Sequence, residues 1–246
     1  MEVQYLSRPR ISEPSMVAAW PGMGYLAKIS ADYLRKRLKA VLFAEIIYYQ
    51  NSIVYREGLA ELPKISHCLY AASDKDLIIC IGEAQPSVPE EAYRLARCII
   101  GIAKRFEVSR VYTMAAYPSE NIETPRVYGV CTNEGLKEVL IKNDVSVLDG
   151  EGMVTGLNGV FIGVAKNSGI EGVCLLGEIR YANVPQNLSA KLVLDRLTSI
   201  LGIGIDTSLL EKRAKRVDDS LRRRLDHFQD PEKEPRKTER NFRYIS

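Results

Sequence analysis

In the first fifth of the chain, the spacing of apolar residues changes from a continuous run to a helical period and then back to a continuous run. Residues 16–20 form a short apolar run that stops at the turn of residues 21–24. Apolar residues then recur at helical spacing as far as Leu38, and residues 40–46 resume a buried-strand pattern. This order predicts a strand-helix-strand unit whose second strand is a parallel neighbour of the first. The glycine turn would then lie at the carboxyl end of the first strand, where α/β proteins bind ligands.

The same rhythm continues along most of the chain. Strands are predicted at residues 76–81, 108–115, 127–132 and 173–177, and helices at residues 87–103, 133–140, 158–166 and 189–201, with Asn133 as a helix cap. This alternation predicts an α/β fold, with a mostly parallel sheet flanked by helices on both faces. Residues 64–72 fit less well, and we interpret them as an added strand or as a hairpin arm with residues 52–55.

The end of the chain has a different pattern. Residues 206–228 predict a helix with a narrow apolar stripe and a basic opposite face; the stripe comprises Leu210, Ala214, Val217, Leu221, Leu225 and Phe228. Residues 229–246 hold two prolines and many charges of both signs, which is typical of a flexible tail. We therefore divide the chain into an α/β core domain (1–205), a C-terminal helix (206–228) and a tail expected to be disordered (229–246).

Composition narrows the classes of function. A net charge of +3 gives no reason to expect nucleic acid or membrane binding, and acids partly balance the basic face of the last helix. The five cysteines form no CxxC pair, no apolar run approaches 18 residues, and we expect no signal peptide. We expect a cytoplasmic protein whose cysteines are core residues. The spacing of acids, histidines and cysteines matches no metal site, so we predict no metal and no cofactor.

Five segments occur in a recognisable order: WPGMG, IGEAQP, PRVYGVCTN, GLNGVFIGVAKNSGIEGVCLLGE and LVLDRLTSILGIGIDTSLLEKRAK. Together they resemble the proteasome assembly chaperone 2 family, which has archaeal members, over about residues 15–217. The resemblance implies an α/β sandwich with nucleoside-phosphorylase-like topology and self-association into small rings or paired dimers. For some members it implies binding to proteasome α subunits, and it implies no catalytic residues.

The last residues of the chain are the candidate contact with proteasome α subunits. Certain archaeal members end in hydrophobic-Tyr-any residue, a tail that docks between proteasome α subunits. This chain ends Phe242-Arg243-Tyr244-Ile245-Ser246, so its tyrosine is third from the end and not second. We take Phe242, Tyr244 and Ile245 as the candidate residues of a partner-docking tail.

A second group of candidates lies at the ends of predicted strands. Gly22 and Gly24 precede a helix, where free backbone N–H groups attract anions, although a tight turn explains both glycines equally well. Glu83, Gln85 and Glu178 follow strands that end at the same sheet edge, and a phosphorylase-like enzyme would use them to hold a ribose or a base. Ordinary loop and capping roles are the alternative. Residues 149–159 contain four glycines and two acids, but their spacing does not match an EF-hand, which favours a plain loop over a lid or a calcium site.

These observations favour a non-enzymatic, assembly-chaperone-like protein that self-associates as a trimer or tetramer and binds protein partners, among them proteasome α subunits. The alternative is a small-molecule or nucleotide-binding enzyme with a deep pocket between Gly22, Glu83 and Glu178. We expect the interface in an apolar, tyrosine-rich segment whose pattern is too irregular for the core. Its large residues are Ile46, Ile47, Tyr48, Tyr49, Ile53 and Tyr55.

Overall fold

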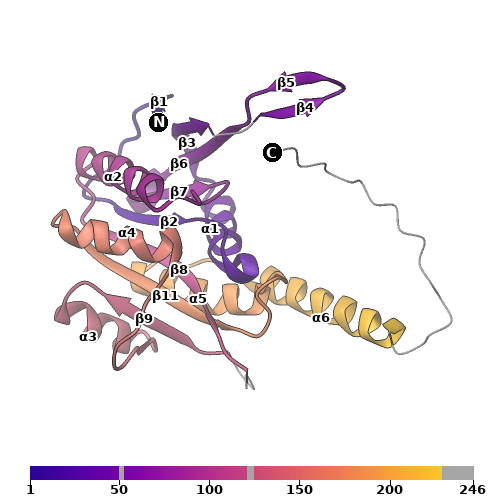
Figure 1. The fold of residues 1–246 in the computed structure, drawn as a ribbon. Coiled ribbons are helices and arrows are strands. Elements are labelled where there is room, and N and C mark those ends of the chain that lie inside the picture. Colours follow the sequence, from indigo (N-terminus) through magenta and orange to yellow (C-terminus); the bar gives the residue numbers. More distant parts are fainter. Residues whose placement is uncertain (50–52, 121–124, 229–246) are drawn as a thin grey trace.

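The computed structural model describes residues 1–49, 53–120 and 125–228, and in them the chain forms a nine-stranded sheet with helices on both faces (Figure 1). The sheet contains β1 (Glu2–Tyr5), β2 (Ser15–Ala19), β3 (Val41–Tyr49), β6 (Lys64–Ala72), β7 (Leu77–Gly82), β8 (Arg110–Pro118), β9 (Val127–Cys131), β10 (Ser146–Val147) and β11 (Glu171–Ile179). The strand order is β1-β3-β6-β7-β2-β8-β11-β9-β10. A separate hairpin is formed by β4 (Val54–Arg56) and β5 (Leu59–Glu61).

Six α-helices connect and cover these strands in the described part of the chain. They are α1 (Leu26–Arg37), α2 (Pro89–Arg105), α3 (Glu134–Lys142), α4 (Gly156–Asn167), α5 (Asn187–Leu201) and α6 (Ser208–Phe228). None of the described helices is both long and apolar enough to cross a membrane. The α/β class predicted from the sequence is confirmed: β7, β2, β8 and β11 form a parallel centre, and antiparallel strands flank it on both sides.

Successive side chains of each central strand point to opposite faces of the sheet, so each strand contributes to two hydrophobic cores, one on each face. In β2 and the residue after it, Met16, Ala18 and Trp20 face one core, while Val17 and Ala19 face the other. The first core includes the apolar faces of α2 and α4, and the second includes those of α1 and α5. A fully buried strand with apolar residues on both sides is what a parallel sheet covered by two helix layers requires.

The strand after α1 is not where the sequence placed it. β3 runs in the same direction as β2, but β6 and β7 lie between the two strands, so they are not neighbours. The helix carries the chain past two positions that later strands fill. Apolar periodicity reports that a strand is buried and says nothing about which strand lies beside it, so this part of the prediction was wrong.

Two further interpretations need correction. Residues 64–72 form an added strand, β6, which lies inside the sheet between β3 and β7, and the alternative of an arm paired with residues 52–55 is wrong because β4 pairs with β5. Ile46, Ile47 and Tyr48 belong to β3 and are at most 9% exposed, so they are core residues and not an irregular interface segment. Their apolar run reflects a strand that is covered on both faces.

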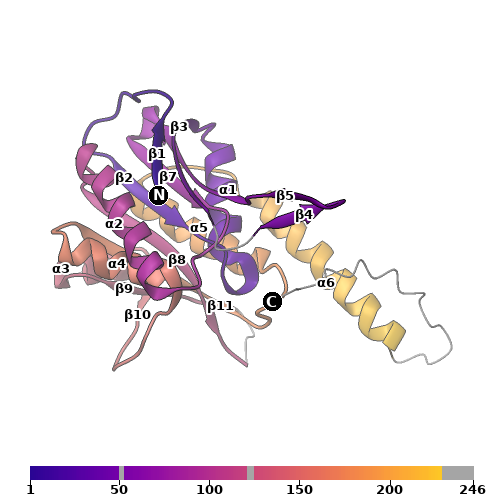
Figure 2. The same cartoon turned by 45° about the horizontal axis from the view of Figure 1, so that its top comes forward.

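The last helix begins as the sequence predicted and packs on α5. The Asp206 carboxylate accepts a hydrogen bond from the backbone N–H of Ser208 at 2.9 Å and pairs with Arg37 at 2.8 Å. Leu210 and Ala214 of the predicted stripe are buried and Val217 is half-buried. The side chains of Leu221, Leu225 and Phe228, like the tail from residue 229, lie outside the described residues. Beyond its first turns the α6 ribbon extends away from the body in both views (Figures 1 and 2).

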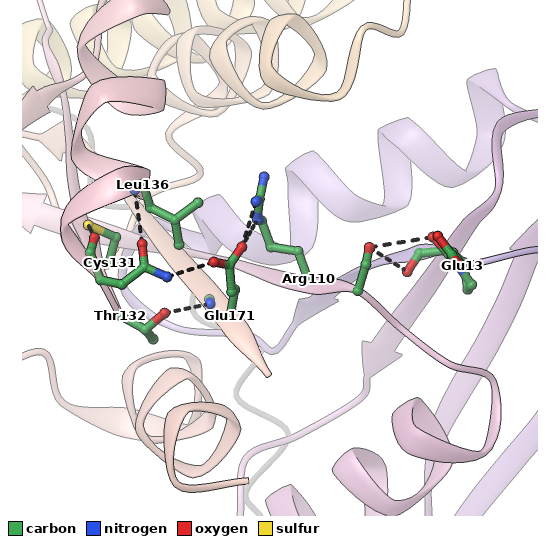
Figure 3. A network of polar contacts seen from close by, with 10 residues as sticks. Glu13, Arg110, Cys131, Thr132, Leu136 and Glu171 are labelled. Atoms are coloured by element: carbon green, nitrogen blue, oxygen red, sulfur yellow. Dashed lines mark hydrogen bonds and ion pairs between the residues drawn. The ribbon is translucent and has the colours of Figure 1, made fainter. Parts of the chain in front are cut away.

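A polar network joins the amino ends of β8 and β11 to α3 (Figure 3). Arg110 pairs with Glu171, whose second oxygen accepts a hydrogen bond from Asn133 Nδ2 at 2.7 Å. Asn133 Oδ1 accepts from the backbone N–H of Leu136 at 3.0 Å, so the predicted cap of this helix is confirmed. Asn133 and Glu171 thus hold the start of α3 against the sheet, at the end opposite to the candidate site.

Candidate functional site at the carboxyl end of the parallel strands

The strands β2 and β8 separate at their carboxyl ends. β8 pairs with β2 only as far as Ala18 and Thr113, whereas its pairing with β11 continues to Pro118. The chain leaves β2 through α1 toward the β3 side of the sheet, while the strands that follow β8 lie on its other side. This is a topological switch point, the place where open α/β sheets form their binding crevices.

The crevice is closed at its base by Asn158, in the first turn of α4. Its Oδ1 accepts a hydrogen bond from the backbone N–H of Trp20 at 3.0 Å, and its Nδ2 donates to the carbonyl oxygen of Trp20 at 3.2 Å. Asn158 is 4% exposed, so water does not reach these groups. β8 no longer pairs with the chain at Trp20, and the amide of Asn158 supplies hydrogen-bond partners for the Trp20 backbone instead. The sequence contained one indication of this role, a lone amide near the start of an otherwise apolar helix.

Above Asn158 lies a cavity of about 580 Å³. It is lined by Gly22, Gln85, the end of β8 (residues 115–118), Leu176 and the loop of residues 148–156. That loop was expected to be a plain solvent loop, and instead it forms one wall of the cavity. Met153 in the loop is 91% exposed, so the wall presents an unpacked apolar side chain to solvent.

Gln85 connects the turn after β2 to the beginning of α4. Its Nε2 donates to the carbonyl oxygen of Pro21, and its Oε1 accepts from the backbone N–H of Leu157 at 2.7 Å. Thr155, at the N-cap of α4, makes no side-chain capping bond, so Gln85 supplies that acceptor from another element. Gly156 has a φ of +75°, and a Cβ there would press on Gln85 Oε1, which explains the glycine.

The two glycines of the predicted anion site have different surroundings. Gly22 lines the cavity, with open space around its Cα except for Gln85 and Asn158. The backbone N–H of Gly24 donates to the carbonyl oxygen of Ala182 at 2.6 Å, and the carbonyl oxygen of Gly24 accepts from Gln186 N–H at 2.9 Å. Gly24 therefore holds the segment before α5, and its positive φ of 63° is the conformation that this turn requires.

The two carboxylates predicted for the crevice bind groups of the protein itself. Glu83 accepts a hydrogen bond from the backbone N–H of Ser66 at 2.9 Å and extends the pairing of β6 with β7. Glu178 is 8% exposed and accepts from the backbone N–H of Arg126 at 2.8 Å and from the hydroxyl of Tyr128 at 3.3 Å. Neither side chain lines the cavity. The structure thus brings Gly22 and Gln85 together, and it places Glu83 and Glu178 outside that cavity.

A buried aromatic cluster lies beside the crevice. His67 is fully buried, and its Nδ1 accepts a hydrogen bond from Trp20 Nε1 at 3.2 Å. The Tyr48 ring stacks on the imidazole with centroids 5.6 Å apart, and Phe161 lies 5.5 Å from the Trp20 ring. Burial lowers the pKa of His67 to about 4 because a charged imidazole is poorly solvated there. A neutral, stacked histidine is part of the core and is not placed to exchange protons with the cavity.

The charges at the cavity limit its chemistry. Of the described residues that line it, Asp149 and Glu151 are acidic and none is a lysine, arginine or histidine. Two carboxylates with no cation among these lining residues repel an anion, so the lining does not favour a nucleotide even though its loop is rich in glycine. Among the described residues, no three histidine, cysteine, aspartate or glutamate side chains gather closely enough to hold a metal ion.

Comparison with known proteins identifies the architecture. The sequence profile of the PAC2 family, the family of proteasome assembly chaperone 2, matches residues 16–224. This chain belongs to the PAC2 family. An uncharacterized protein of Methanocaldococcus jannaschii is 29% identical over 205 residues, which are 81% of this chain and 78% of that protein. The family resemblance inferred from the five sequence segments is therefore confirmed.

Two solved structures share the fold of this PAC2 chain over nearly its whole length. The crystal structure of Pyrococcus furiosus PbaB, an archaeal proteasome activator, superposes with a TM-score of 0.79 at 30% identity and covers 91% of this chain and 98% of PbaB. Pyrococcus furiosus PbaA, an archaeal homologue of proteasome-assembly chaperone, gives a TM-score of 0.76 at 22% identity and covers 93% of each chain. The second likeness concerns the fold alone.

Proposed function

We propose that this PAC2 protein is a non-enzymatic, chaperone-like protein that self-associates as a trimer or tetramer and binds proteasome α subunits. The observation that carries the proposal is the likeness to PbaB, at 30% identity over 91% of the chain. The arrangement of the candidate site supports it, because Glu83 and Glu178 accept hydrogen bonds from backbone N–H groups and the histidine beside the crevice, His67, is buried and neutral. A cytoplasmic location accords with this role.

The carboxyl terminus is the proposed docking segment. Phe242, Tyr244 and Ile245 lie outside the described residues, and we place the partner contact on them from their sequence alone.

Affinity capture from extracts of the native cell tests both parts. The full chain should recover proteasome α subunits, identified by mass spectrometry, and a chain without residues 242–246 should recover far less. A truncated chain that recovers the same amount would remove the tail from the proposal. If neither chain recovers proteasome subunits, the chaperone function itself is contradicted.

The 580 Å³ cavity supports a second candidate, the binding of a small neutral or cationic molecule by Gly22, Gln85 and the loop of residues 148–156. A bound ligand would raise the melting temperature, because it stabilises the folded state by an amount that grows with the logarithm of its concentration over its dissociation constant. A thermal-shift screen should therefore detect it. Gly22→Val would fill the cavity beside Gln85 and Asn158 and should abolish any such shift, with Gly204→Val, which has open space around it, as the control.

A further inference from the structure

The β4–β5 hairpin stands apart from the rest of the molecule. Its two strands pair only with each other and project from the body in both views (Figures 1 and 2). We call residues 53–62 the arm. Its large apolar residues are Ile53, Tyr55, Leu59 and Leu62, which are 61%, 52%, 75% and 55% exposed. An isolated two-stranded hairpin is at best marginally stable in water, so the arm requires a surface to pack on.

A second exposed apolar surface lies at the turn before α1. Two backbone hydrogen bonds, from Gly24 to Ala182 and from Gln186 to Gly24, join this turn to the segment before α5. Around them Met23, Tyr25, Tyr181 and Leu188 are 44%, 49%, 49% and 39% exposed, and we call these four residues the turn patch. Large apolar side chains gathered in this way mark interaction surfaces.

Tyr25 adds an independent observation. It adopts the left-handed conformation, with φ 52° and ψ 18°, and is the only aromatic among the described non-glycine residues with positive φ. A bulky side chain in this region is strained, and such strain is concentrated at functional sites. Asparagine adopts this conformation more readily and also caps helices well, so stability alone does not explain an exposed tyrosine here.

We infer that the arm of one copy packs on the turn patch of a second copy of this chain. The inference rests on the proposed self-association and names the two surfaces of one of its contacts. The arm and the amino end of α1 lie on the same side of the sheet, the right in Figure 1, so two copies facing each other across a two-fold axis exchange arms reciprocally. This exchange closes at a pair of chains, so a tetramer would join two such pairs through a further surface.

The arm and the turn patch are together large enough for a stable contact with a second copy of the chain. The arm and the turn patch together offer eight large apolar side chains on each copy, each between 39% and 75% exposed. This is a surface on the order of the roughly 800 Å² that one partner contributes to a stable interface. A reciprocal contact covers both surfaces of both copies at once, and two tyrosines on the turn patch are of the type that interfaces favour.

Charge substitution on the arm tests the inference. Because Tyr55 and Leu59 are exposed in the single chain, Tyr55→Asp with Leu59→Asp should leave its fold unchanged and weaken association about ten-fold or more. Light scattering at micromolar concentration gives the mass, and circular dichroism checks the fold. Ile141→Asp, on α3 and 63% exposed, is the matched control and should keep the mass of the unmodified chain.

The turn patch has its own variant. Tyr25→Asn relieves the backbone strain, so it should keep or raise the melting temperature while weakening association about ten-fold. If the arm variant and Tyr25→Asn both retain the full mass, the arm contact is wrong and self-association uses another surface. If the unmodified chain is already a monomer at these concentrations, the proposed self-association fails together with this inference.

Photo-cross-linking identifies the contact directly. A benzophenone amino acid in place of Tyr55 should cross-link to peptides that contain residues 22–25 or 181–188. In an equimolar mixture of ¹⁵N-labelled and unlabelled chains, a contact between copies gives cross-linked peptides of mixed isotope content. Cross-links confined to one chain, or to other segments of the second copy, would overturn the inference.

Discussion

The side-chain amide of Asn158 pairs with both backbone polar groups of Trp20, accepting from its N–H at 3.0 Å and donating to its carbonyl oxygen at 3.2 Å. The two residues are 138 positions apart, and the contact joins the end of β2 to the first turn of α4. It lies where β2 and β8 diverge, so one side chain holds the base of the crevice closed.

Removal of that amide should destabilise the protein strongly. Asn158→Ala leaves two buried backbone groups of Trp20 unpaired, and we expect the free energy of unfolding to fall by about 2–4 kcal/mol. Trp20 is the only tryptophan, so its fluorescence follows denaturant unfolding at this very position. Asn167→Ala, at the exposed end of the same helix, should change stability by less than about 0.5 kcal/mol. Equal effects of the two substitutions would contradict this role for Asn158.

The buried imidazole of His67 should make stability depend on pH. Its folded-state pKa is lowered to about 4 from 6.5, so between these values the unfolded chain binds a proton that the folded chain does not. The free energy of unfolding should therefore decrease as pH falls from 6.5 to 4, by a total of about 3 kcal/mol from this residue, and it should gain nothing from it above pH 6.5.

His67→Asn isolates this contribution. The asparagine oxygen can still accept the hydrogen bond from Trp20 Nε1, but the side chain does not titrate. The variant should lose most of the slope of stability against pH between 4 and 6.5, whatever its stability at neutral pH. An unchanged slope would assign the acid sensitivity to other groups.

Two glycine substitutions should act in opposite directions. A Cβ on Gly82 would overlap the Trp20 ring and His67 Nδ1, both of which are fixed in the core, so Gly82→Ala should destabilise the fold by about 3 kcal/mol or more. Gly101 lies inside α2 with nothing near its Cα, and Gly101→Ala should stabilise the protein by about 0.5–1 kcal/mol. Melting temperatures of the two variants on opposite sides of the unmodified value would agree with the structure, and a tolerated Gly82→Ala would not.

Sequence patterns predicted the elements better than their partners. The run from Met16 to Trp20, the glycine turn and the cap at Asn133 were all located correctly, because each depends on local spacing and local hydrogen bonds. The places of β3 and β6 in the sheet depend on pairing between distant strands, to which a single sequence gives no direct access. Buried tyrosine and isoleucine in β3 resembled an interface for the same reason.

For the candidate site, the sequence indicated which residues lie near the carboxyl edge of the sheet, but not which of them line the cavity. Gly22 and Gln85 do meet at the carboxyl edge, since parallel strands bring their ends together. The structure shows in addition which side chains are already satisfied: Glu83 and Glu178 accept hydrogen bonds from backbone groups of residues that no sequence pattern links to them. Asn158 and His67 were missed because their partner, Trp20, becomes a neighbour only in the folded chain.

Binding to isolated proteasome subunits tests the central claim most directly. Purified α subunits and purified β subunits of the proteasome from the same cell are immobilised separately, and the equilibrium binding of the full chain is measured by surface plasmon resonance. We predict saturable binding to the α subunits, with loss of affinity on removal of residues 242–246, and none to the β subunits. Absence of binding to α subunits at concentrations up to about 100 μM, beyond the range of specific protein contacts of standard size, would contradict the account.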